Sequence, residues 1–259
     1  MNKTPIGWVK NPDGSQGYTW NPITGCLNGC SYCYARKLAN GRLRQRYLAN
    51  LNVIPYIGEE QYMRKRSDPF YPRFWLKRLW ELYRSRMKPR GIFVCDMGEL
   101  FGDWLPRQWQ DAVFETIRMN DRHRFYLLTK QPQNLIKFSP FPDNCWAGVT
   151  ATDRYGYSRG IPGLRRIEAK LKFISFEPLL ERIEVWDSKD YWLEAEIGWV
   201  IIGAQTKPYK PPKWEWVSEI IEACAKANIP YFLKNNLEPI MPKVFGGDGP
   251  LIQELPCVK

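Results

Sequence analysis

Short apolar segments recur along the chain and alternate with longer segments of helical period. The apolar segments are nearly continuous in aliphatic, aromatic and β-branched residues, and polar residues follow them, which is typical of buried parallel strands. We predict such strands at residues 91–97, 124–130, 145–150, 172–178, 198–204 and 230–235, with a weaker one at residues 17–20. Strands that alternate with helices predict an α/β fold with a parallel sheet. Seven strands favour a partial or full (β/α) TIM-like barrel over an open sheet.

Helical periodicity accounts for much of the sequence between these strands. The segment 73–87 is predicted as an amphipathic helix whose apolar face consists of Leu76, Leu79, Trp80, Tyr83 and Met87. Further helices are predicted at residues 35–48, 107–119 and 214–227. The connection between residues 150 and 172 is short and rich in glycine, so we expect only a brief helix there. We predict one domain for residues 1–259, with a basic helical insertion at about residues 36–90 between the first and second strands.

The composition is that of a globular protein that can bury a core. Of 259 residues, 44% are hydrophobic and 25% are charged. No apolar run reaches the roughly 20 residues of a membrane span, and the first residues contain no apolar signal-peptide core. We therefore expect a cytoplasmic protein without a membrane partner. The seven cysteines are an odd number, and three of them are crowded together. This is a poor disulfide framework and indicates metal ligands in a reducing compartment.

The positive charge of the chain is concentrated in one segment. The net charge is +11, and residues 34–91, with 15 Lys and Arg against 4 Asp and Glu, account for the whole excess. Such a concentration suits a polyanionic partner, nucleic acid first, although a solvated helix face gives the same pattern. The candidate phosphate contacts are Arg42, Arg44, Arg46, Arg64, Lys65 and Arg66.

Cys26, Cys30 and Cys33 follow the first predicted strand with the spacing C-x3-C-x2-C. Soft thiolates favour zinc or an iron–sulfur cluster. A structural zinc site needs four ligands, but the single histidine, His123, lies far along the chain and the other four cysteines are scattered. A four-iron cubane held by three thiolates leaves one iron open for a substrate or cofactor. The count of three therefore favours a [4Fe–4S] cluster, with zinc as the alternative.

The cysteine spacing, with the aromatic Tyr32 directly before the last cysteine, resembles the signature of the radical S-adenosylmethionine enzymes. The resemblance implies a barrel of that superfamily's type, with the cluster loop after its first strand. It also implies S-adenosylmethionine as cofactor, bound to the open iron through its amino and carboxylate groups. One-electron cleavage then gives a 5′-deoxyadenosyl radical, which requires a reductant such as flavodoxin or ferredoxin.

A second resemblance covers nearly the whole chain. Successive blocks, among them TWNPITGC (19–26), IFVCDMGELF (92–101) and FISFEPLL (173–180), are similar to those of the phage-associated Gp37/Gp68-like family. Members of that family are mainly of unknown function, so this resemblance supports the fold and the cofactor and says little about the substrate. They often have a Gly-Gly-Glu-Ser-type turn after the sixth strand, where this chain has Gly203, Ala204, Gln205 and Thr206.

Polar residues at the predicted strand ends are candidates for cofactor binding. Gly98 and Glu99 match two of the three positions of a Gly-Gly-Glu-like segment that often holds the cofactor's amino group in radical S-adenosylmethionine enzymes. The carboxyl ends of barrel strands converge on one mouth. The candidate set is Tyr32, Gly98, Glu99, Thr129, Lys130, Ser175, Glu177 and Gln205. Each of these side chains can instead bond to a neighbouring loop.

Two further residues near the cysteines are candidates for a role in the chemistry. Cys95, next to Asp96 at the end of the second strand, can return a hydrogen atom to a product radical. Strand alternation places these two residues on opposite faces, so at most one of them points into the barrel. Arg36 lies three residues beyond Cys33 and can pair with the cofactor carboxylate or with the charge of the cluster.

Together these observations predict a radical S-adenosylmethionine enzyme that modifies or repairs a nucleic acid base. One alternative is a radical S-adenosylmethionine enzyme that acts on a peptide or a small metabolite. Another is a non-catalytic nucleic-acid-binding protein that carries zinc or an iron–sulfur cluster. Nucleic-acid binding with a steep salt dependence separates the first two, and cleavage of S-adenosylmethionine excludes the third.

Overall fold

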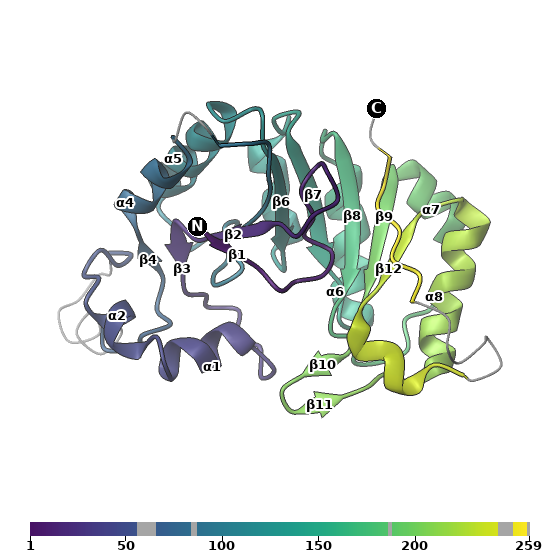
Figure 1. Cartoon of the computed structure of the whole chain (residues 1–259). Coiled ribbons are helices and arrows are strands. Elements are labelled where there is room, and N and C mark those ends of the chain that lie inside the picture. Colours follow the sequence, from purple (N-terminus) through teal and green to yellow (C-terminus); the bar gives the residue numbers. More distant parts are fainter. Residues whose placement is uncertain (56–65, 84–86, 186–187, 243–250, 258–259) are drawn as a thin grey trace. The chain divides into compact units, whose positions relative to one another are not determined.

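The computed structural model describes residues 1–55, 66–83, 87–185, 188–242 and 251–257. The chain divides into two compact units (Figure 1). Unit 1 comprises Met1–Pro5 and Val9–Leu127, and unit 2 comprises Ile6–Trp8 and Leu128–Lys259. Each unit is built on its own set of mostly parallel strands.

The strands of unit 1 follow the order β1-β2-β5-β6. β1 (Asn2–Lys3) pairs antiparallel with β2 (Tyr18–Trp20), whereas β2, β5 (Gly91–Val94) and β6 (Arg124–Thr129) run parallel. The last two residues of β6 belong to unit 2. A small antiparallel pair joins β3 (Ile23–Thr24) to β4 (Arg73–Phe74). The predicted strands are confirmed, but β5 ends at Val94 because Cys95 has a φ of +58° and leaves the extended conformation.

The helices of unit 1 are α1 (Tyr34–Asn40), α2 (Arg44–Leu48), α4 (Leu76–Leu79), the 3-10 turn η1 (Trp80–Leu82) and α5 (Arg107–Arg118). α5 confirms the helix predicted at residues 107–119. The helix predicted at residues 35–48 is interrupted, because α1 ends at Asn40. Its C-cap is Gly41, whose N–H donates to the carbonyl of Lys37.

The helix predicted at residues 73–87 is wrong in its length and in its buried face. Arg73 and Phe74 form β4, so the helical turns begin only at Leu76, and residues 84–86 lie outside the described residues. Leu79 and Leu82 are buried, whereas Leu76 and Trp80 are 59% and 67% exposed. Only part of the apolar face predicted from the sequence is therefore buried.

The sheet of unit 2 is entirely parallel and has the order β7-β8-β9-β12. Its strands are β7 (Cys145–Thr150), β8 (Leu171–Phe176), β9 (Ile197–Ile202) and β12 (Tyr231–Leu233), which confirms the four predicted strands. An antiparallel hairpin of β10 (Gln205–Thr206) and β11 (Tyr209–Lys210) follows β9. One face of the sheet carries an aromatic cluster in which the rings of Trp8, Phe173 and Trp199 lie 5.7 to 6.2 Å apart.

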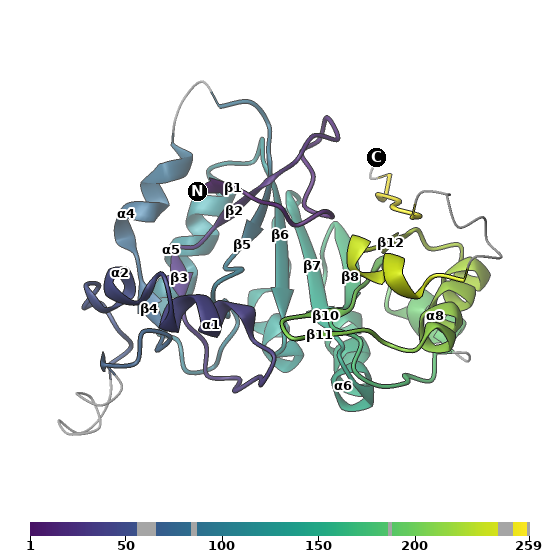
Figure 2. The ribbon, with the colours of Figure 1, turned by 60° about the horizontal axis from the view of Figure 1, so that its bottom comes forward.

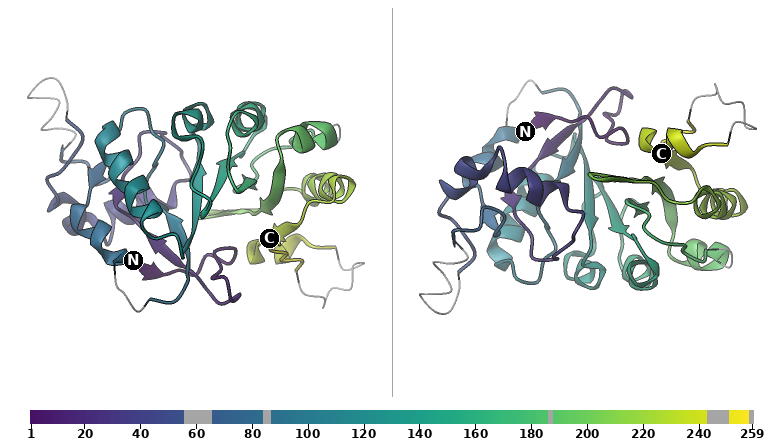
Figure 3. Two further views of the ribbon diagram at one scale, coloured as in Figure 1. Left: turned by 90° about the horizontal axis from the view of Figure 1, so that it is seen from above. Right: turned by 90° about the horizontal axis from the view of Figure 1, so that it is seen from below.

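The helices α6 (Arg154–Arg165), α7 (Ser188–Glu194) and α8 (Trp214–Ala227) lie along one face of this sheet (Figure 3). Two 3-10 segments, η2 (Pro132–Phe138) and η3 (Asn235–Ile240), complete unit 2. α8 has the predicted bounds. The brief helix expected before residue 172 is wrong, because α6 has 12 residues. Its glycines allow close packing: a Cβ on Gly160 would lie 2.9 Å from Val149, and one on Gly163 would lie 2.7 Å from Pro132.

The predicted α/β class with mostly parallel strands is confirmed. Among the described strands the order does not close into a full barrel, so the partial form of the prediction applies. Among the described residues, no helix combines the length and the apolar character needed to cross a bilayer. Between β2 and β5, the first and second parallel strands, lie α1, α2, β4 and α4, where the basic insertion is predicted.

His123, which is buried just before β6, predicts an acid-sensitive contribution to stability. Its Nδ1 accepts the backbone N–H of Arg90 at 3.2 Å, and burial lowers its pKa from 6.5 to about 4. Because the unfolded state then binds the proton first, this stability is complete above pH 6.5 and falls as the pH drops toward 4. The variant His123→Asn, whose Oδ1 can accept the same N–H, is expected to flatten the pH dependence of the unfolding free energy across this window. Urea unfolding at several pH values measures this, and equal slopes in both proteins would contradict it.

Candidate metal and cofactor site

The three clustered cysteines lie on a loop of unit 1 between β3 and α1. Two glycines bend this loop, Gly25 with a φ of +87° and Gly29 with a φ of +71°. Residues with a Cβ rarely adopt such conformations. The N–H of Cys26 donates to the carbonyl of Phe70 at 3.2 Å, so the first cysteine is held against the inserted segment.

The thiols of Cys26, Cys30 and Cys33 are free and half-buried. The backbone N–H of Asn28 donates to Sγ of Cys26, and that of Arg36 donates to Sγ of Cys33, each at 3.3 Å. Cys33 is also the N-cap of α1, so the helix fixes its position. Hydrogen bonds to sulfur favour the thiolate and tune iron–sulfur clusters. This donor set, soft thiols with N–H groups directed at them, fits an iron–sulfur cluster.

The Cys26 thiol needs a cation to act as a thiolate. Burial, and after it the charge of Glu99, raises its pKa to about 12. A metal deprotonates a coordinating thiol outright, so ligation of iron would offset both of these effects on the pKa. Among the described residues, no three His, Cys, Asp or Glu side chains lie close enough to hold one metal ion. The thiolates of a cubane bind separate iron atoms, so such a cluster does not require them to converge on a single point.

Gly98 lies beside the cysteine loop. The N–H of Gly25 donates to the carbonyl of Met97 at 2.9 Å, and Gly25 and Gly98 form a parallel bridge. A Cβ on Gly98 would lie 3.0 Å from the carbonyl oxygen of Ile23 and 3.1 Å from that of Gly25. The glycine therefore permits the close approach of two backbone segments.

Glu99 also contacts the cysteine loop, and it does so through its side chain. Its carboxylate accepts the side-chain amide of Asn28 at 3.2 Å and the backbone N–H of Phe101 at 3.1 Å. Glu99 is only 4% exposed. The structure thus brings the carboxylate of Glu99, predicted to bind the cofactor, next to the cysteine loop that carries the predicted cluster ligands. Asn28, which the sequence did not single out, connects the two.

Replacing Asn28 by Ala is expected to destabilise unit 1 by about 1–2 kcal/mol, because the buried Glu99 carboxylate loses an amide donor. The control is Asn40→Ala, which removes an exposed side chain that donates to the carbonyl of Arg36 on the surface of α1. Its expected cost is below about 0.5 kcal/mol. Urea unfolding measures both. Equal effects of the two substitutions would show that the contact between Asn28 and Glu99 adds nothing specific.

A polar network at the end of β5 ties α1 to the sheet of unit 1. The side-chain amide of Asn21 donates to the Asp96 carboxylate at 2.6 Å, and its carbonyl oxygen accepts the N–H of Met97 at 2.9 Å. The hydroxyl of Tyr34 donates to the backbone carbonyl of Asp96 at 2.8 Å. Burial raises the pKa of Asp96. Tyr34 directly follows Cys33, so this network positions the cysteine-bearing helix. The sequence signal was present in the polar Asn21 directly after a strand.

The prediction that Cys95 and Asp96 lie on opposite strand faces is wrong, because β5 ends at Val94, before both residues. Cys95 has a φ of +58°, and its carbonyl accepts the N–H of Gly98 at 2.9 Å, which closes a turn. The thiol is buried, and burial raises its pKa to about 12. Its role as a hydrogen-atom donor stays a prediction.

The side chain of Arg36 contacts three other residues of unit 1. Its guanidinium pairs with the carboxylate of Asp68 and donates to the carbonyl of Cys26, each at 3.3 Å, and it lies 4.9 Å from the ring centroid of Phe70. Arg36 thereby connects the first turn of α1, the first cysteine and the inserted segment. Tyr32, between the second and third cysteines, is half-buried.

The strand ends of unit 2 gather a second polar group. The ammonium of Lys234 pairs with the carboxylate of Glu177, which also accepts the indole N–H of Trp8 at 3.4 Å. A Cβ on Gly203 would lie 2.7 Å from the Lys234 side chain, so this glycine leaves room for the ion pair. Ser175, two residues before Glu177, is fully buried, and its hydroxyl has no hydrogen-bond partner among the described residues. It is suited to a polar ligand group.

Three other predicted cofactor residues also lie in unit 2. The hydroxyl of Thr129 accepts the N–H of Gln131 at 2.8 Å, so it closes the turn after β6. Lys130 is half-buried. The side-chain amide of Gln205 donates to the carbonyl of Pro208 at 2.9 Å within the β10–β11 hairpin. For Thr129 and Gln205 the structure supplies a local partner, and the cofactor roles of all three stay predictions.

The predicted phosphate contacts lie in the insertion of unit 1. Arg42, Arg44 and Arg46 are exposed on and next to α2. Arg66 is half-buried, and its carbonyl accepts the guanidinium of Arg73 at 2.7 Å. Arg64 and Lys65 lie outside the described residues.

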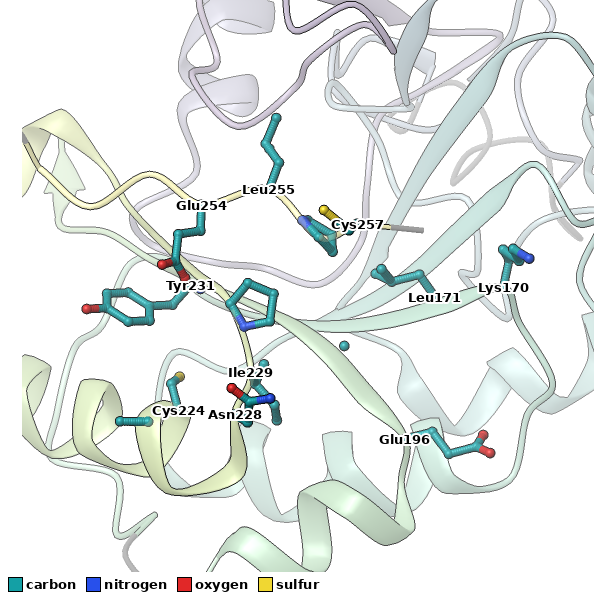
Figure 4. A pocket seen from close by; sticks show the side chains of 14 residues that line it. Lys170, Leu171, Glu196, Cys224, Asn228, Ile229, Tyr231, Glu254, Leu255 and Cys257 are labelled. Carbon is teal, nitrogen blue, oxygen red and sulfur yellow. Dashed lines mark hydrogen bonds between the residues drawn. The ribbon is translucent and has the colours of Figure 1, made fainter. Parts of the chain in front are cut away.

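A cavity of about 940 Å³ lies in unit 2 but involves none of the predicted site residues (Figure 4). It is lined by residues at the amino ends of β8, β9 and β12, among them Leu171, Gly198 and Tyr231, and by Glu254 and Leu255. In parallel α/β folds the chemistry sits at the opposite, carboxyl ends of the strands. The cavity is therefore not part of the candidate site.

The profile of a family described as a protein of unknown function (DUF5131) matches residues 3–240. The chain belongs to the DUF5131 family. The narrower resemblance to the Gp37/Gp68-like family stays a prediction. A comparison with curated proteins gives no match.

Solved structures similar to this DUF5131 chain include two mutants of spore photoproduct lyase. The first is 10% identical over 82% of this chain and 74% of that one, with a TM-score of 0.48. The second, with bound AdoMet and dinucleoside spore photoproduct, is 12% identical over 86% and 74%, with a TM-score of 0.47. SuiB of Streptococcus suis, bound to the precursor peptide SuiA, is 8% identical over 85% and 49%, with a TM-score of 0.46.

Proposed function

We propose that this protein is an enzyme that binds a [4Fe–4S] cluster through Cys26, Cys30 and Cys33 and cleaves S-adenosylmethionine reductively. The contact between the cysteine loop and Glu99 supports the proposal most directly. Three thiols leave one iron for the cofactor. The buried carboxylate that can accept the cofactor's ammonium is hydrogen-bonded to the same loop, through Asn28.

When bound, the cluster supplies the electron that cleaves S-adenosylmethionine to methionine and a 5′-deoxyadenosyl radical, and it draws that electron from a reductant such as flavodoxin or ferredoxin. The residues of the chain hold the cluster-binding loop in position and bind the ligands. Arg36 and the Asp96 network fix the loop and the helix that carry the cysteines. Within unit 2, the hydroxyl of Ser175 and the pair formed by Glu177 and Lys234 are proposed to bind polar groups of a ligand. The reducing cytoplasm suits such a cluster.

Anaerobic reconstitution with iron and sulfide tests the proposal. The expected result is a brown protein with about four irons per chain that releases 5′-deoxyadenosine after reduction in the presence of S-adenosylmethionine. A colourless protein that retains zinc would overturn the proposal in favour of a zinc-bearing binding protein. A protein that acquires the cluster but releases no 5′-deoxyadenosine would overturn the enzymatic part.

For the substrate we propose a nucleic acid base, in modification or in repair. The supporting observation is that Arg42, Arg44 and Arg46 are exposed in the same unit as the cysteine loop. Binding to an oligonucleotide is expected to weaken steeply with salt, because each phosphate contact adds about 0.7 to 0.9 to the steepness with which log K falls against log salt. Replacing the three arginines by Gln should reduce this slope. If the protein binds no nucleic acid at low salt, the nucleic-acid substrate is excluded and a peptide or metabolite takes its place.

A further inference from the structure

The β10–β11 hairpin of unit 2 carries a second basic segment that the charge profile of the chain conceals. Residues 205–214 contain Lys207, Lys210 and Lys213 and no acidic residue. Outside residues 34–91 the chain has equal numbers of basic and acidic residues, so this local excess disappears in the total. Residues 206–211 are all exposed. Within the part of the chain that the structure describes, neither Lys210 nor Lys213 forms an ion pair.

The hairpin starts at the carboxyl end of β9, the end at which parallel α/β proteins place their ligands. Figures 1 and 2 show it beyond the carboxyl ends of β8 and β9 in unit 2. The pair formed by Glu177 and Lys234 lies at this same end, directly after β8 and β12. A ligand that contacts the hairpin therefore lies on the side of unit 2 where Ser175 and Glu177 are proposed to act.

Asn236 holds the hairpin in place. Its side-chain amide donates to the carbonyl of Ala204 at 2.7 Å, and its side-chain oxygen accepts the N–H of Ala204 at 3.0 Å. The hydroxyl of Tyr209 donates to the backbone carbonyl of Asn236 at 3.0 Å. A two-stranded hairpin is marginal by itself, and these bonds tie β11 and the residue that precedes β10 to η3. Lys207 and Lys210 are thus carried on a fixed support, and Lys213 is the N-cap residue of α8.

Tyr209 adds an aromatic surface between the lysines. Tyr209 is 46% exposed although its hydroxyl is hydrogen-bonded, so the side chain is anchored at its tip while the residue is accessible to solvent. Exposed aromatic rings next to basic side chains are the combination with which proteins bind single-stranded nucleic acid, through stacking on bases and contacts to phosphate.

We propose that the β10–β11 hairpin is a nucleic-acid contact arm. Lys207, Lys210 and Lys213 contact the phosphate backbone of an unpaired strand, and Tyr209 stacks on one of its bases. The inference rests on the nucleic-acid substrate proposed above and adds a contact surface in unit 2 to the arginines of unit 1. It needs no bound cluster, so it can be tested by binding alone.

The experiment uses the full chain and a fluorescein-labelled single-stranded oligonucleotide of mixed sequence, with affinity measured by anisotropy over a series of KCl concentrations. In the variant Lys207→Gln/Lys210→Gln/Lys213→Gln the slope of log K against log salt should become shallower by about 2, because each lost contact to a single strand contributes about 0.7 to its steepness. Tyr209→Leu should weaken binding about tenfold without changing the slope, because stacking releases no counterions. Tyr209→Phe should retain most of the affinity.

The matched control is Lys137→Gln/Lys170→Gln/Lys226→Gln. It removes the same charge from unit 2 at exposed positions that precede β7, β8 and β12, at the amino ends of the strands. Its slope should stay within about 0.5 of the wild-type value. Both triple variants change only exposed side chains, and melting curves establish that each remains folded.

Each of the other possible results contradicts one part of the proposal. If the wild type does not bind the oligonucleotide at low salt, the nucleic-acid substrate itself fails. If it binds but the hairpin and control variants have equal slopes, the arm fails while the arginines of unit 1 remain. If the hairpin variant loses binding to phosphatidylserine vesicles but keeps its affinity for the oligonucleotide, the arm binds anionic lipid and the inference is wrong.

Discussion

Replacing Cys33 by Ser is expected to abolish cluster binding and leave the fold intact. Sγ of Cys33 accepts the N–H of Arg36 as the N-cap of α1, and a serine hydroxyl is among the best N-cap acceptors. It is a poor ligand for iron compared with a thiolate. Iron content after reconstitution should fall to background. The yield of 5′-deoxyadenosine should fall by more than about 100-fold, since even partners outside the ligand shell cost 10–100-fold.

Two further variants separate ligation from capping. Cys33→Ala removes both functions and should lose the cluster and also about 1 kcal/mol of stability. Cys257→Ser changes the exposed cysteine near the end of the chain and should leave iron content unchanged. If Cys33→Ser takes up iron and cleaves S-adenosylmethionine like the wild type, the three-cysteine assignment is wrong. If Cys33→Ser loses its folded structure together with iron, the premise that serine replaces the thiol as the N-cap of α1 is wrong.

The sequence predicted the parallel strands well, because burial on both faces leaves a continuous apolar run that periodicity recognises. It failed at residues 73–87, where a helical period was present. Arg73 is fully buried, and its guanidinium donates to the carbonyls of Asn50, Asp68 and Tyr71. The bond to Asn50, 23 positions away, and the pairing of β4 with β3 hold Arg73 in a strand instead of in a helix. A local pattern contains no information about them, so tertiary contacts determined the outcome.

At the candidate site, too, the sequence predicted what depends on local pattern and missed what depends on tertiary contacts. The thiol count and spacing indicated a cluster, because ligand chemistry is local in sequence. The residues that hold the loop are not local. Asn28 reaches Glu99, 71 positions away, and Tyr34 reaches Asp96, 62 positions away. The resemblance implies cofactor binding by Gly98, which stays a prediction, and the structure shows that its missing Cβ makes room for the backbone of Ile23 and Gly25. The sequence identified the residue, and only the fold shows which group approaches it.

Replacing Gly25 by Ala is expected to cost about 3–5 kcal/mol of unfolding free energy, or to prevent folding of unit 1. Two costs add here. A φ of +87° disfavours any residue with a Cβ. The new methyl would also lie 2.6 Å from the carbonyl oxygen of Phe70 and 2.7 Å from the carbonyl carbon of Tyr71. Those neighbours are backbone atoms and cannot rotate away, so the segment that receives the Cys26 N–H must shift.

Gly29 is the matched control. It has a φ of +71°, and among the described residues beyond its two chain neighbours no heavy atom lies within 4 Å of the position of its Cβ. Gly29→Ala therefore carries only the conformational cost, about 1–2 kcal/mol, and Gly29→Asn should cost less because asparagine tolerates this conformation. Urea unfolding of the protein without metal gives the three values, and reconstitution gives the iron content. The expected order of stability is wild type, Gly29→Asn, Gly29→Ala and Gly25→Ala, with iron uptake retained in both Gly29 variants. Equal costs at Gly25 and Gly29 would show that the contact with Phe70 is not maintained in solution. The cysteine loop would then owe its shape to the cluster instead of to the fold.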